Sequence, residues 1–143
     1  MTMREPDFSK LSLLVIDDQE YIRKLIVQLL KRLGCNTIFE AGDGSEGLNA
    51  LNRVEIDLVL CDIKMQPVDG LDFLRKVRSG DGIKDRHVPV VFLTSDSDRG
   101  TVMAAIQSDV DGYLVKPVSP NELKAKIVAV LSKRMAARGV RWG

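Results

Sequence analysis

The sequence is poor in the residues that build disulfide frameworks and many metal sites, with one histidine and two cysteines among 143 residues. His87 alone argues against a cluster of histidine ligands or a catalytic histidine, and its place before an apolar run favours a loop. Cys35 and Cys61 are isolated, and neither belongs to a C-x-x-C pair. We therefore expect reduced thiols in a cytosolic protein, not a disulfide or metal framework.

Long hydrophobic runs and an excess of charge are also missing. No apolar stretch approaches the roughly 20 residues that a membrane-spanning helix needs. The first ten residues are polar and lack the apolar core of a signal peptide. The 21 Lys and Arg residues nearly balance the 20 Asp and Glu residues, so the net charge is +1. This balance gives no reason to expect nucleic acid or membrane as a partner, and we predict a cytoplasmic protein.

The chain does contain a regular alternation of short apolar runs and amphipathic segments. Five apolar runs, each fit for a buried strand, alternate with segments whose apolar residues recur at helical spacing. This pattern predicts an α/β protein with a five-stranded parallel sheet and five helices on its two faces. The expected strands are 11–17, 37–40, 57–61, 90–94 and 113–115, and the expected helices are 20–33, 47–51, 71–78, 99–107 and 120–136.

The length suits one domain with a sizeable core and leaves no room for a second of similar size. We expect a flexible lead-in over 1–10, the domain over 11–134 and a tail over 135–143. Gly34 is expected to end the first helix, and Ser119 to cap the last helix at Pro120.

Four of the apolar runs end on side chains with useful chemistry. Because parallel strands bring their carboxyl ends to one edge of a sheet, these side chains are expected to meet there, where open sheets bind ligands. The residues are Asp17 and Asp18 after the first run, Asp62 after the third, Thr94 after the fourth and Lys116 after the fifth.

Three neighbouring carboxylates repel one another and raise a pKa unless a cation is present. Mg²⁺ takes one or two carboxylates together with phosphoryl oxygens, while a lysine ammonium and a threonine hydroxyl suit a phosphate. Simpler interpretations exist for each residue. Asp17 and Asp18 could merely cap a helix that starts near Gln19, and Lys116 could be an ordinary surface lysine.

In combination, the motifs resemble the response regulator receiver domain over about residues 11–134. They are Val15-Ile16-Asp17-Asp18, Asp62-Ile63-Lys64-Met65 with Asp69-Gly70, Leu93-Thr94-Ser95, and Tyr113-Leu114-Val115-Lys116-Pro117. The resemblance implies a flavodoxin-like, doubly wound fold and a single-domain, chemotaxis-regulator-like protein of two-component signalling.

The resemblance also implies a role for each site residue. Asp62 would accept a phosphoryl group from a sensor histidine kinase or a histidine phosphotransfer protein. Asp17, Asp18, Asp62 and the backbone carbonyl of Lys64 would hold Mg²⁺. Thr94 and Lys116 would bind the phosphoryl oxygens, Thr94 and Tyr113 would act as the switch, and the bond before Pro117 would be cis. The protein would be no enzyme beyond its own phosphorylation and dephosphorylation.

The resemblance further implies that a downstream protein binds the face of the fourth helix, fifth strand and fifth helix. Two positions depart from the usual pattern of the family. Gln66 separates Met65 from Pro67, and Asp109 stands in a stretch that usually carries glycine. Asp109 would have to adopt a helix-ending turn that glycine makes easily.

Three other readings remain open. A hydrolase with an aspartyl-phosphate intermediate usually has a second Asp two residues after the nucleophile, where this chain has Lys64. A scaffold of receiver fold would not be phosphorylated, and a receiver excised from a longer regulator would share every motif. We expect no output domain after Lys133, so that output runs through a partner.

Overall fold

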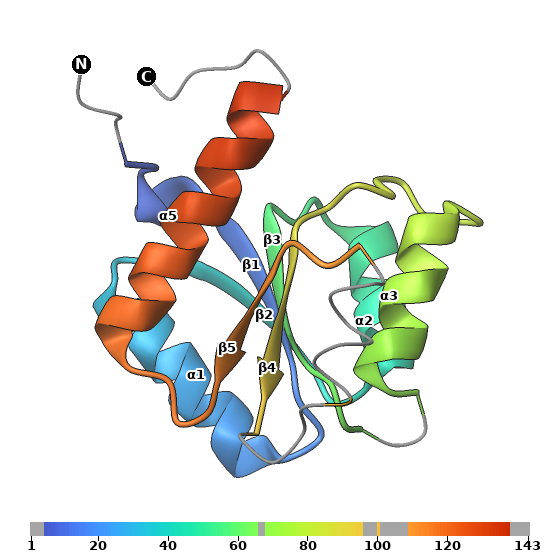
Figure 1. The fold of residues 1–143 in the computed structure, drawn as a ribbon, viewed down its shortest axis with the longest axis horizontal. Helices are drawn as coiled ribbons and strands as arrows, with labels where there is room; N and C mark the ends of the chain where they lie inside the picture. The colour runs from blue at the N-terminus through green and yellow to red at the C-terminus, as the bar shows by residue number, and fades with distance from the viewer. Residues whose placement is uncertain (1–4, 66–67, 96–99, 101–108, 138–143) are drawn as a thin grey trace.

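The computed structural model describes residues 5–65, 68–95, 100 and 109–137. Five parallel strands form one sheet in the order β2-β1-β3-β4-β5 (Figure 1), which is the flavodoxin-like, doubly wound order. The predicted fold class is thereby confirmed. The strands are β1 (Ser12–Ile16), β2 (Thr37–Ala41), β3 (Leu58–Asp62), β4 (Val90–Thr94) and β5 (Gly112–Val115).

Helices lie on both faces of the sheet: α1 (Glu20–Arg32) and α5 (Pro120–Ala137) cover one face, and α2 (Gly44–Arg53) and α3 (Gly70–Ser79) cover the other (Figure 1). The predicted fourth helix, 99–107, lies outside the described residues except for Gly100. Alternate side chains of each strand enter the two cores, so that Leu13 and Val15 join the core of α1 and α5 while Leu14 and Ile16 join the other. A continuous apolar run is thus what a strand covered on both sides requires.

The predicted signals at the helix ends are present. Gly34 follows α1 with φ 101°, a conformation that glycine adopts without strain. The Ser119 hydroxyl accepts a hydrogen bond from the Glu122 N–H at 3.1 Å and so caps the first turn of α5. Asp69 caps α3 in the same way, through the N–H of Asp72.

Two expectations about the ends of the chain need correction. Phe8 lies in a 3₁₀ helix (Phe8–Lys10) and is buried among the side chains of α1 and β1, so residues 8–10 belong to the packed domain. The α5 helix ends at Ala137, one residue beyond the expected helix 120–136, so residues 135–137 of the expected tail are helical.

Cys35 and Cys61 are both buried, free thiols, as expected from their isolation in the sequence. Within the described ranges, no helix has the length and apolar character to cross a membrane. His87 is exposed and precedes the buried Val88, as predicted for a loop residue.

Candidate phosphoryl-acceptor site

The side chains predicted to meet at the carboxyl edge of the sheet do so. Asp62 is the last residue of β3 and Thr94 the last of β4, while Asp17 and Lys116 directly follow β1 and β5. The strand register keeps these ends level, because Ile16 pairs with Cys61, Asp62 with Leu93, and Thr94 with Val115. Carboxylate oxygens of Asp17, Asp18 and Asp62 lie within 4.8 Å of one another.

Lys116 reaches into this cluster of carboxylates. Its ammonium nitrogen Nζ lies 3.2 Å from Oδ2 of Asp17 and 3.4 Å from Oδ1 of Asp62. The side chain of Lys116 is 23% exposed, and that of Asp17 is fully buried. Lys116 is therefore paired with two carboxylates, and the reading as an ordinary surface lysine is wrong. Its bond to Pro117 is cis, as the resemblance implied.

The surroundings of Asp62 disfavour its ionised form. Burial raises the pKa of Asp62, the Lys116 ammonium opposes this, and the nearby Asp17 and Asp18 raise it again, to about 6. The ionised form of Asp62 is thus disfavoured relative to an exposed aspartate. A further cation beside the cluster would relieve this cost, and the oxygen donors present are those that Mg²⁺ prefers.

Asp17 has two tasks. Its Oδ1 accepts a hydrogen bond from the N–H of Gln19 at 2.9 Å, directly before the first residue of α1. Its Oδ2 faces Lys116 in the carboxylate cluster. Asp17 therefore belongs to the carboxylate cluster and also shapes the turn before α1. The N-cap of α1 is Gln19 and has no side-chain cap hydrogen bond, so the capping interpretation is wrong, and Asp18 is exposed at the rim.

The loop after β3 packs closely against the start of α3 at Gly70. The Gly70 N–H donates to the Ile63 carbonyl at 2.7 Å and closes the loop onto the start of α3. A Cβ atom on Gly70 would lie 2.6 Å from the Asp62 carbonyl oxygen, so any larger residue would displace the strand end. Gln66 and Pro67, where the sequence departs from the usual pattern of the family, lie outside the described residues. Lys64 is an exposed loop residue, and the role of its carbonyl stays a prediction.

Thr94 and Tyr113 occupy neighbouring strands, as the switch hypothesis requires. Thr94 is buried, with its hydroxyl donating to the Ser95 carbonyl at 3.3 Å. Its own carbonyl accepts from the Lys116 N–H at 2.8 Å, which connects β4 to the residue after β5. Tyr113 lies on the edge strand β5 and its side chain is partly exposed.

Sequence reasoning missed Arg23, although it stands one turn into the helix that follows Asp17-Asp18. Its Nη1 donates to the backbone carbonyl of Asp17 at 2.8 Å, and its Nε pairs with Glu40 of β2 at 3.0 Å. Only the nearness of a basic residue to the paired aspartates could have pointed to it. The contact with β2 depends on tertiary structure.

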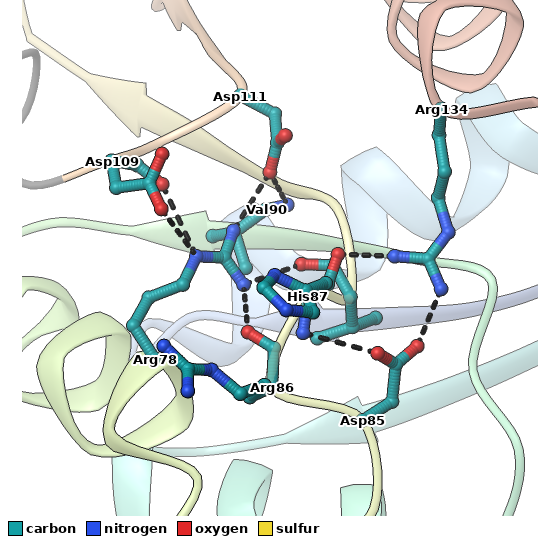
Figure 2. A network of polar contacts seen from close by, with 9 residues as sticks. Arg78, Asp85, Arg86, His87, Val90, Asp109, Asp111 and Arg134 are labelled. Carbon is teal, nitrogen blue, oxygen red and sulfur yellow. Dashed lines mark hydrogen bonds and ion pairs between the residues drawn. The ribbon is translucent and has the colours of Figure 1, made fainter. Parts of the chain in front are cut away.

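A second polar network, also missed, lies at the opposite, amino edge of the sheet (Figure 2). Arg78 at the end of α3 donates to the carbonyls of Arg86 and Val88 at 2.8 Å and pairs with Asp111 at 2.8 Å. Asp111 in turn accepts from the N–H of Val90, the first residue of β4, at 2.7 Å. This network joins α3 to the starts of β4 and β5.

Two flanking contacts extend the network shown in Figure 2. Asp109 adopts φ 63°, as expected for a residue in a turn that favours glycine, and its carboxylate lies 3.7 Å from Nε of Arg78. On the other side, Arg134 of α5 pairs with Asp85 at 2.6 Å and donates to the His87 carbonyl. These contacts connect α3, the loop before β4, the turn before β5 and α5 at this edge.

Comparison with known proteins decides the family. The family model of the response regulator receiver domain matches residues 13–128. The chain belongs to the response regulator receiver domain family. It is 34% identical to the chemotaxis protein CheY of Pseudomonas aeruginosa over 123 residues, which is 86% of this chain and 98% of the relative.

Solved receiver domains have the same fold. A response regulator receiver domain from Clostridium thermocellum superposes with a TM-score of 0.78 at 30% identity, covering 89% of this chain and 98% of the other. The receiver domain of the sensor histidine kinase PA1611 from Pseudomonas aeruginosa, with magnesium in its active-site cleft, gives 0.75 at 24% identity, covering 85% and 98%. The protein is a CheY-like receiver of two-component signalling.

Proposed function

We propose that Asp62 accepts a phosphoryl group from a phosphohistidine of a sensor histidine kinase or a histidine phosphotransfer protein. One observation carries this proposal: the Lys116 ammonium lies 3.4 Å from Oδ1 of Asp62, within a cluster of three carboxylates at the end of parallel strands. A carboxylate at such a place is a nucleophile with a cation beside it, ready for an incoming anionic group.

The transfer is a substitution at phosphorus. A carboxylate oxygen of Asp62 forms a bond to phosphorus, the bond from phosphorus to the donor imidazole nitrogen breaks, and its electron pair stays on that nitrogen. The product is an acyl phosphate on Asp62. Lys116 is placed to offset charge on the phosphoryl oxygens, since its ammonium already contacts the acceptor carboxylate. The protein thus catalyses its own phosphorylation and dephosphorylation and acts on no other substrate.

Mg²⁺ fits the donor set of this site. Asp17, Asp18 and Asp62 supply hard oxygen ligands that lie close together, and the charges of Asp17 and Asp18 add to the effect of burial in raising the pKa of Asp62. We assign these three carboxylates, with the backbone carbonyl of Lys64, as the residues that hold the ion. Bound there, Mg²⁺ would neutralise charge on the transferred group.

The new charge on Asp62 supplies the signal. An acyl phosphate carries roughly −1.5 to −2 charges, by analogy with other phosphorylated side chains, in place of one carboxylate charge. Thr94, at the end of the next strand, donates its hydroxyl to the phosphoryl group and gives up its contact with Ser95. That movement changes the space open to Tyr113 on β5. The face of the fourth helix, β5 and α5 then binds a downstream protein.

The test is the intact mass of the protein after incubation with acetyl phosphate and MgCl₂. The wild type should gain the mass of one phosphoryl group, the gain should vanish with EDTA, and Asp62→Asn should show none. Asp57→Asn is a suitable control, because Asp57 binds the Ser12 N–H at the amino edge of the sheet. An unlabelled wild type would favour the scaffold reading, and normal labelling of Asp62→Asn would place the acceptor elsewhere.

A further inference from the structure

The side chain of Arg23 contacts the turn that carries Asp17 and Asp18 from outside the carboxylate cluster. Arg23 of α1 donates from Nη1 to the Asp17 backbone carbonyl at 2.8 Å. The guanidinium is largely buried, with the side chain 16% exposed. A charged donor to a carbonyl in such a place makes a strong hydrogen bond, because little water competes for either group.

The same guanidinium is fixed at its other edge by the neighbouring strand. Nε of Arg23 lies 3.0 Å from Oε1 of Glu40, and Nζ of Lys24 lies 2.9 Å from Oε2 of the same carboxylate. Burial acts to raise the pKa of Glu40, but hydrogen bonds from Lys24 and Arg23 outweigh burial and hold it below its usual range. Glu40 therefore stays ionised near neutral pH and keeps the Arg23 fork in one orientation.

The backbone on either side of Asp17 is tied down as well. The Asp17 N–H donates to the Ala41 carbonyl of β2 at 3.1 Å, and the Arg23 N–H donates to the Gln19 carbonyl at 2.9 Å. The Arg23 side chain thus closes a loop of contacts that runs from β2 through Asp17 into the first turn of α1. A small rotation of the Asp17 peptide would swing its carboxylate, and with it the adjacent Asp18, relative to Asp62.

We propose that Arg23, oriented by Glu40, is a positioning residue for the divalent-cation site, setting the geometry of the Asp17-Asp18 turn without touching the ion. This inference rests on the proposed function, since it assigns the residue that prepares its metal site. Arg23 acts through the backbone, so its loss misplaces ligands while leaving their charge and number unchanged. Outer contacts that orient ligands contribute about ten- to a hundred-fold to metal affinity.

The experiment measures Mg²⁺ affinity by calorimetric titration of wild type, Arg23→Met, Arg23→Lys and Glu40→Gln at pH 8. Arg23→Met should weaken Mg²⁺ binding about tenfold, the lower end of that range. Arg23→Lys should recover part of the loss, because an ammonium can donate to the Asp17 carbonyl but does not reproduce the two-sided fork. Glu40→Gln should fall between wild type and Arg23→Met.

Lys24→Met is the matched control. It removes the other cation on Glu40, with a side chain 54% exposed and without the Asp17 contact, so Mg²⁺ affinity should stay within about twofold of wild type. Urea unfolding in EDTA is measured in parallel. If Arg23→Met loses stability yet binds Mg²⁺ as tightly as wild type, Arg23 is merely structural and the inference is overturned. A wild type that binds no Mg²⁺ would instead overturn the metal assignment itself.

Discussion

Nζ of Lys116 lies 3.2 Å from Oδ2 of the fully buried Asp17, although 99 residues separate the two along the chain. The contact joins the residue after β1 to the residue after the edge strand β5, although β3 and β4 lie between these two strands in the sheet. Together with the second contact of Lys116, to Asp62, it makes one lysine the counter-ion of two carboxylates. Most predictions for the site follow from this shortage of positive charge.

Replacement of Asp62 by Asn should stabilise the metal-free protein. The pKa of Asp62 is raised, mainly by burial, from 3.8 to about 6, so the folded protein holds this proton more tightly than the unfolded chain. Ionisation therefore costs stability, with a penalty that grows between pH 3.8 and about 6 and stays constant above. In EDTA, urea unfolding should show Asp62→Asn to be more stable by about 1–3 kcal/mol at pH 7. The gain in stability should vanish near pH 3.8. Equal stability of Asp62→Asn and wild type at pH 7 would contradict the prediction.

Removal of the Lys116 charge should make the site bind Mg²⁺ more tightly while harming phosphorylation. Lys116→Met takes away a cation that repels an incoming metal ion, and two charges near 4 Å interact by about 1 kcal/mol even in water. The Mg²⁺ dissociation constant at pH 8 should fall several-fold, and labelling by acetyl phosphate should slow. Lys124→Met removes a surface ion pair between Lys124 of α5 and Glu5. This control should change neither the Mg²⁺ dissociation constant nor the rate of labelling. Weaker Mg²⁺ binding in Lys116→Met would show that the ammonium orders the carboxylates more than it competes.

Thr94→Ala should separate phosphorylation from its structural consequence. A hydrogen bond to a charged acceptor is worth roughly 1.5–3 kcal/mol, enough to shift a two-state equilibrium about ten- to a hundred-fold. Phospho-Asp62 should still form in Thr94→Ala, but the amide NMR signals of Gly112–Val115 should no longer move on phosphorylation. Thr94→Ser keeps the hydroxyl and should retain the response. If Thr94→Ala responds like wild type, the signal reaches Tyr113 by another route.

Asp109→Gly should stabilise the protein slightly. Asp109 holds φ 63°, which glycine adopts freely, and its 85%-exposed carboxylate forms only a 3.7 Å pair with Arg78. Relief of the backbone should raise the free energy of unfolding by up to about 1 kcal/mol. Asp109→Ala is the control, since alanine keeps the unfavourable φ and should destabilise. Identical effects of Gly and Ala, read from urea unfolding, would show that the side chain and not the backbone matters there.

The sequence by itself determined the fold class and most of the candidate site. Apolar runs of strand length alternating with helical spacing leave few arrangements other than a doubly wound parallel sheet, because both faces must be covered. Once the strands are parallel, residues that end them must share one edge, which is why Asp17, Asp62, Thr94 and Lys116 were found from their position alone. The non-glycine turn at Asp109 was visible for a similar local reason, since backbone conformation depends on residue type.

Only the tertiary structure decided how these groups are held and balanced. The pairing of Lys116 with both Asp17 and Asp62 depends on the level at which β1, β3 and β5 end, which is set by register. The contact of Arg23 with Glu40 needs β2 to lie beside β1, and the Arg78 network needs the end of α3 to meet the loops before β4 and β5 at the amino edge. The contacts of Lys116 with Asp17 and of Arg78 with Asp111 join residues far apart in the chain, so neither spacing nor periodicity indicates them. The raised pKa of Asp62 has the same origin, because burial and neighbouring charge exist only in the folded chain.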